Sequence, residues 1–123
     1  MLANRVAARD GALPTSTLVA NLRDEHLHRW RPPGGGALGA LTHVTIHGLD
    51  ITVPLALAPT STAAAQRLVL EGLVAGGDRN HFGVPLDGVA LQTTDIDWSC
   101  GAGEPVTGTA AQLILRLSAR RLP

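Results

Sequence analysis

The stretch ALGALTHVTIHGLDI, residues 37–51, decides the fold of this chain, because its pattern fits both types of regular structure. The β-branched run of Val44, Thr45 and Ile46 favours a strand. Four apolar residues instead have a spacing that roughly suits one face of a helix. These residues are Leu38, Leu41, Val44 and Ile51. Propensity and spacing alone leave both structures open.

Two histidines of this stretch, His43 and His47, make the choice important for function. In a helix, residues four apart share a face and lie about 6 Å apart along the axis, so both imidazoles can reach one metal ion. In a strand the same residues stand roughly 13 Å apart, which is too far for chelation. In the helical case, Asp50 lies close enough to accept the N–H of a ligating imidazole and to orient it.

The histidine pair also has a simpler interpretation. H-x-x-x-H lacks the glutamate that makes the H-E-x-x-H motif specific for a metal site. His43 and His47 would then be exposed or hydrogen-bonded helix residues, with Asp50 a polar residue near the end of the helix. The spacing leaves both interpretations open.

The segments before residue 37 predict helices followed by a turn. Residues 3–9 fit the tail of one helix. The hydroxyls of Thr15 and Ser16 can cap a second helix, which we expect from Ser16 to Trp30. RPPGGG, residues 31–36, cannot continue it, because two prolines and three glycines remove both hydrogen-bond donors and rigidity.

The segments after residue 51 predict helix, strands and helix. We expect a helix at about 61–75, stopped by two glycines. The stretch VALQTTDIDW, residues 89–98, predicts a strand, because its residues alternate over 89–94. We expect 99–105 to turn the chain and 104–108 to return as a short antiparallel partner. A leucine-rich helix at 109–120 then closes the chain.

Together these elements predict an α+β fold. Only three aromatic residues occur, which is unusual for an all-β sandwich and common in helical packing. We expect a partial helical bundle in residues 1–76, with helices at about 16–30, 37–51 and 61–75. A β-hairpin and the last helix would form residues 77–123.

Composition excludes several classes of partner. The net charge is zero and the largest basic cluster is Arg120 and Arg121, so the footprint needed to bind nucleic acid is absent. No apolar run reaches the roughly 18 residues of a membrane span, and the first ten residues carry charges where a signal peptide needs an apolar stretch. One cysteine, Cys100, leaves no internal disulfide. We therefore expect a cytoplasmic protein without nucleic-acid or membrane partners.

Two ordered motifs resemble the maleylpyruvate isomerase family of mycothiol-dependent enzymes, which are built on a DinB-like four-helix bundle. THVTIHGLDITVPLAL resembles the H-G-x-D-I-x-x-P-L core of that family. VALQTTDIDWSCGAGEPVTGTAAQLILRL is similar to its tail, with a D-x-D-W-S turn, a G-x-G-x-x-V-x-G turn and a leucine-rich last helix. The matches cover most of the chain from Ala37 onward. The resemblance implies a helix for residues 37–51.

The resemblance also implies a divalent metal, zinc first, held by three side chains. Two of them are four residues apart on one helix: His47 matches the histidine of the family, and His43 stands where glutamate is frequent. The third ligand of the family is a histidine on the first helix, and the resemblance implies that this chain begins after that helix and its neighbour. Around the Pro-Leu pair, Val53 and Ala56 replace residues that are often Arg and Gly.

The implied activity is that of an isomerase or thiol transferase with mycothiol as cosubstrate and a small electrophilic substrate. In the isomerase the thiolate adds to a cis double bond, the new single bond rotates, and elimination restores a trans alkene. The sequence assigns no catalytic residue beyond the metal pair. The rival hypothesis is a non-catalytic paralogue whose uncovered apolar helix faces pair with a second copy, which predicts self-association.

Other polar residues have simpler structural roles. Cys100, expected in a turn, is most simply a free thiol. Asp95 and Asp97 alternate on a predicted strand face near a turn, where solvated charges are ordinary. We expect Trp98 to anchor the hairpin against the helices.

Two further histidines have no assigned partner. His26 falls near Leu22 and Trp30 on its predicted helix and could replace the third metal ligand, although an interfacial histidine is the simpler interpretation. His81 lies in a predicted loop.

Overall fold

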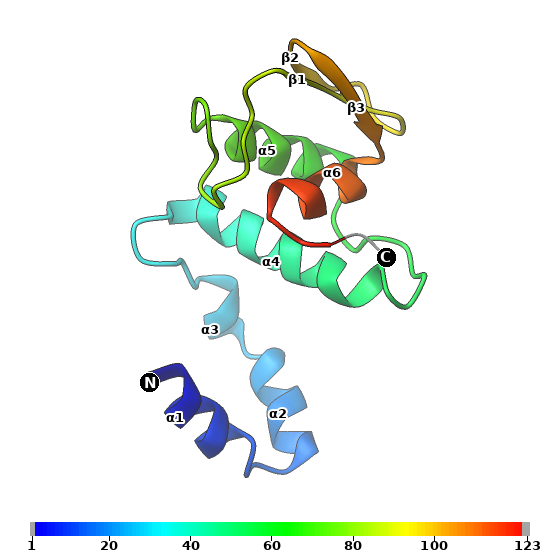
Figure 1. The fold of residues 1–123 in the computed structure, drawn as a ribbon. Helices are drawn as coiled ribbons and strands as arrows, with labels where there is room; N and C mark the ends of the chain where they lie inside the picture. Colours follow the sequence, from blue (N-terminus) through cyan, green and yellow to red (C-terminus); the bar gives the residue numbers. More distant parts are fainter. Residues whose placement is uncertain (1, 122–123) are drawn as a thin grey trace. The chain divides into compact units, whose positions relative to one another are not determined.

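The computed structural model describes residues 2–121 and has a mixed α+β fold. The chain divides into two compact units, Met1–Arg31 and Pro32–Pro123. Within the described residues there are six helices and one three-stranded sheet, and the last of the six helices follows the sheet (Figure 1). The predicted α+β class is therefore confirmed.

The first unit contains helices α1 (Leu2–Asp10), α2 (Thr15–Leu22) and α3 (Glu25–His28). The prediction of one continuous helix from residue 16 to residue 30 is wrong. Asp24 has an extended backbone, with φ −67° and ψ 132°, and its carboxylate accepts the backbone N–H of His26 at 2.8 Å. Such a side-chain bond competes with helix continuation and starts a new helix instead. The same bond, with one to the His26 ring, lowers the pKa of Asp24.

The second unit contains the three helices α4 (Gly36–Thr52), α5 (Ala63–Val74) and α6 (Ala110–Leu117). The deciding stretch is therefore helical, and the helices expected near residues 61–75 and 109–120 are also confirmed. The side chain of Thr62 caps α5 by accepting the N–H of Ala65 at 3.2 Å. None of the described helices combines the length and the apolar character required to cross a bilayer.

The sheet contains β1 (Val89–Thr93), β2 (Ser99–Gly101) and β3 (Glu104–Gly108), in the order β2-β1-β3. β2 pairs with β1 in an antiparallel hairpin, whereas β3 pairs with β1 in parallel. The prediction that β3 is antiparallel is therefore wrong, and so is that of a turn throughout 99–105.

Two glycines explain the direction of β3. Gly101 has φ 84° and Gly103 has φ 130°, which L residues with a side chain rarely adopt. These conformations carry the chain past the start of β1 to its other edge. A Cβ atom at Gly103 would also collide with the carbonyl of Gly88. Only glycine fits this crossing.

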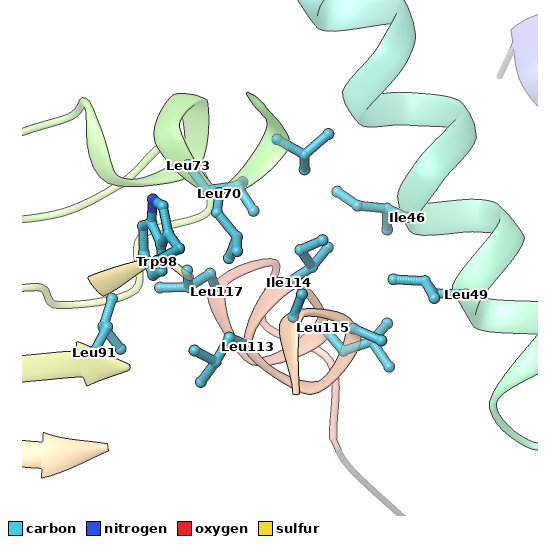
Figure 2. Close-up of a cluster of buried hydrophobic side chains, with 13 residues drawn as sticks. Ile46, Leu49, Leu70, Leu73, Leu91, Trp98, Leu113, Ile114, Leu115 and Leu117 are labelled. Carbon is cyan, nitrogen blue, oxygen red and sulfur yellow. The ribbon is translucent and has the colours of Figure 1, made fainter. Parts of the chain in front are cut away.

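Helix α6 lies at the centre of the second unit and packs against α4, α5 and the sheet. Six of its eight residues are buried. Figure 2 shows Ile114 between the labelled side chains of α4 and those of α5. Trp98 is 7% exposed and belongs to the same core, which confirms its predicted anchoring role.

The core predicts that two leucines of α5 contribute very different amounts to the free energy of unfolding. Leu70 is 0% exposed and Leu68 is 51% exposed. We expect Leu70→Ala to lower the free energy of unfolding by about 2–5 kcal/mol, because it leaves a cavity. The matched control Leu68→Ala should cost less than about 1 kcal/mol, since half of that side chain is already in water. Urea unfolding of both variants measures this, and equal losses would contradict the packing described.

Candidate metal site on helix α4

His43 and His47 lie one turn apart on α4, and both are exposed. Their ring centroids are 4.5 Å apart and their planes are inclined at 73°. The helix therefore brings the two predicted ligands together, which a strand would not do.

Asp50 adjoins the second histidine. Nδ1 of His47 lies 3.1 Å from Oδ2 of Asp50, three residues further along the helix. An ionised carboxylate can only accept, so the imidazole donates from Nδ1 in this hydrogen bond. The lone pair of a neutral ring is then on Nε2. This contact is the one expected of an orienting partner for a metal ligand.

Arg120, which the sequence pattern did not single out, contacts Asp50 from the end of the second unit. Its Nε lies 3.3 Å from Oδ1 and its Nη2 lies 3.3 Å from Oδ2 of Asp50. Its Nη1 donates to the carbonyl of Ser118 at 2.8 Å. One carboxylate thus joins a residue after α6 to a histidine of α4. Because the two residues of this ion pair are far apart in the sequence, no local sequence pattern predicts that they meet.

A cavity of about 630 Å³ borders the histidine pair. His81 and Phe82, from the loop before β1, line it together with His43, His47 and Arg120. The rings of His81 and Phe82 pack edge to face with centroids 5.3 Å apart. The cavity therefore brings three of the five histidines of the chain to one place.

Asn80 holds this loop. It is buried, its Nδ2 donates to the carbonyl of Leu117 at 2.5 Å, and its Oδ1 accepts the N–H groups of Phe82 and Val84. The predicted loop is thus fastened to the end of α6. The turn-forming residues around His81 predict a loop, but they do not indicate which residues the loop contacts.

Within the part of the chain that the structure describes, no third ligand joins the pair. Among residues 2–121, no three His, Cys, Asp or Glu side chains are grouped so that they could hold a metal ion. His26, considered as a replacement ligand, belongs to α3, and its Nδ1 lies 2.7 Å from Oδ1 of Asp24. Its bond to Asp24 gives it a local role at the start of α3.

The remaining candidates lie around the hairpin. Cys100 is a half-buried free thiol in β2, not in a turn. It borders a depression of about 450 Å³ beside Trp98. Asp95 and Asp97 follow the end of β1 instead of sharing a strand face. The carboxylate of Asp95 accepts the N–H of Ala110 at 2.8 Å, at the start of α6.

The hydrogen bond of Asp95 predicts that replacing Asp95 lowers the free energy of unfolding more than replacing Asp97. Asp95→Ala leaves an N–H of the first turn of α6 without its acceptor, so we expect a loss of about 1 kcal/mol in the free energy of unfolding. The control Asp97→Ala should change it by about 0.5 kcal/mol or less, as is usual for exposed surface positions. Thermal and urea unfolding measure both variants. Equal stability of the two would argue against a capping role for Asp95.

Comparisons with known proteins add no assignment to this geometry. No family model matches the chain, and no match was found among curated proteins or solved structures. The functional case therefore depends on the residues of the α4 site.

Proposed function

We propose that this chain binds one divalent metal ion, zinc first, through His43 and His47, in a protein of the mycothiol-dependent isomerase or thiol transferase type. The 4.5 Å separation of the two ring centroids carries the proposal. A metal about 2.1 Å from one nitrogen of each ring lies roughly 3.2 Å from each ring centre, so the two centres would be about 5 Å apart in a near-tetrahedral site. The observed spacing is within about 1 Å of this value, so a small rotation of the side chains reaches it.

The donor set suits zinc. Imidazole nitrogen is a common zinc ligand, and Asp50 fixes one of the two rings. Two ligands from the chain leave coordination positions for water, a thiol or a further protein ligand. A bound divalent cation would favour the thiolate form of a cosubstrate, which is the nucleophilic form.

The cavity supports a small-molecule function. Its volume of about 630 Å³ is within the usual range for ligand sites. Leu38, Ile46 and Leu73 give it an apolar wall beside the imidazoles. This combination suits a small thiol, for which the resemblance suggests mycothiol, and an electrophilic substrate. A reducing compartment, the cytoplasm, would keep such a thiol and Cys100 reduced.

Metal binding is tested with two pairs of histidines. We expect the intact protein to bind Zn²⁺ in calorimetric titration, and His43→Ala/His47→Ala to lose at least about 100-fold in affinity, because removing ligands costs more than removing their outer partners. The control His26→Ala/His28→Ala removes as many imidazoles from α3 and should keep the affinity. Equal affinities of both double variants would refute the site.

A second candidate function is favoured by one observation. Val44 and Ile51 on α4, and Leu55 after it, are 59%, 63% and 63% exposed. Val44 and Ile51 are seven residues apart, so they share a helix face. In this view the chain is a non-catalytic module whose α4 face pairs with a second copy.

Self-association is measured by size-exclusion chromatography with light scattering. The second candidate predicts an oligomer that is unaffected by EDTA and dissociated by Ile51→Glu, because a charge in an apolar contact is costly. The control Leu68→Glu, on α5, should leave it intact. A monomer at high protein concentration would exclude this function.

A further inference from the structure

We propose that Arg120 is a positioning residue for the α4 site: it holds the carboxylate of Asp50, and Asp50 holds the His47 ring in the tautomer with its proton on Nδ1. The effect on metal affinity depends on the proposed function. The tautomer does not, because it is a property of the metal-free protein.

The contact between Arg120 and Asp50 restrains the carboxylate at both oxygens. Nε approaches Oδ1 and Nη2 approaches Oδ2, each at 3.3 Å. Two parallel N–H donors of a planar guanidinium fix the plane of a carboxylate as well as its position. Oδ2 also accepts from Nδ1 of His47. Arg120 and His47 therefore share one oxygen, and the orientation of one donor affects the other.

Arg120 is itself held in place. Ala119 has φ 58°, and the backbone N–H groups of Ala119 and Arg120 donate to the carbonyls of Arg116 and Leu115 at 3.1 and 2.9 Å. These bonds form the Schellman motif that ends α6. The side chain donates to Ser118, and its Cζ lies 5.9 Å from the centroid of Phe82. A surface arginine without such contacts would lose more entropy on binding Asp50.

The restrained carboxylate of Asp50 affects Nε2 of His47, the ring nitrogen that is not bonded to it. The hydrogen bond of one ring nitrogen determines where the proton of a neutral imidazole lies. With Nδ1–H bonded to Asp50, Nε2 keeps its lone pair for a metal ion. Without a restrained acceptor, both tautomers are populated and Nε2 carries the proton part of the time.

The experiment reads the tautomer of each histidine in ¹⁵N-labelled, metal-free protein from long-range ¹H–¹⁵N correlation spectra at about pH 8, which is above the ordinary range of imidazole titration in peptides. We expect His47 to be mainly the Nδ1–H form. Arg120→Gln should shift it measurably toward Nε2–H, and Asp50→Ala should shift it further. Arg121→Gln, at an exposed neighbouring position, is the matched control and should change nothing.

The conservative variant separates positioning from stability. Arg120→Lys keeps the charge and loses the planar fork, so we expect a smaller shift of the tautomer than with Gln. In Zn²⁺ titrations Arg120→Gln should bind about 10–100-fold more weakly, as for other outer partners of metal ligands. A merely structural arginine would lower the midpoint of unfolding and leave the His47 tautomer of the folded protein unchanged.

The two proposals fail in different ways. An unchanged His47 tautomer in Arg120→Gln, or in Arg120→Lys where the Gln variant does not fold, overturns the positioning role. A tautomer shift in a protein that binds no Zn²⁺ supports that role and refutes the metal site.

Discussion

Burial of α6 is the constraint on which the second unit depends. Its residues contact α4 on one side, and α5 and the sheet on others. Thr109 and Gln112 form a capping box that satisfies backbone N–H groups at the start of this helix. Because one short helix supplies the common packing surface, the elements that carry His47 and Phe82 are positioned through it. The candidate site is a consequence of this packing as much as of its own residues.

The helices were predictable where local signals agreed. In the structure Thr62 and Thr109 cap α5 and α6, and each precedes an apolar pattern of helical period, so local residues account for where these two helices lie. The helical state of α4 was not settled by spacing or propensity, and the resemblance to a known family decided it.

The errors arose where a single backbone conformation outweighed the pattern. The carboxylate of Asp24 ended one helix and began another within an otherwise helical pattern. The parallel direction of β3 depends on the positive φ angles at Gly101 and Gly103. Alternation of apolar residues predicts a strand but carries no information on the direction of its partner.

The candidate site also has a part that the sequence pattern predicts and a part that it does not. His43, His47 and Asp50 lie within three turns of one helix, so their proximity follows from spacing alone once that helix is known. Arg120 and the loop with His81 come from distant parts of the chain. Their approach depends on the packing of α6, on the buried Asn80 and on the turn at Ala119, none of which leaves a pattern near α4.

The sequence distance between Asp50 and Arg120 also matters during synthesis. Their contact joins residues 70 positions apart. Chains emerge from the ribosome from the N-terminal end and domains fold as units, so α4 leaves the exit tunnel well before Arg120 has been added. A nascent chain at that stage presents both imidazoles without the arginine that restrains their neighbour. Under the proposed function, the affinity of this pair for a metal ion would reach its full value only after Arg120 has left the tunnel.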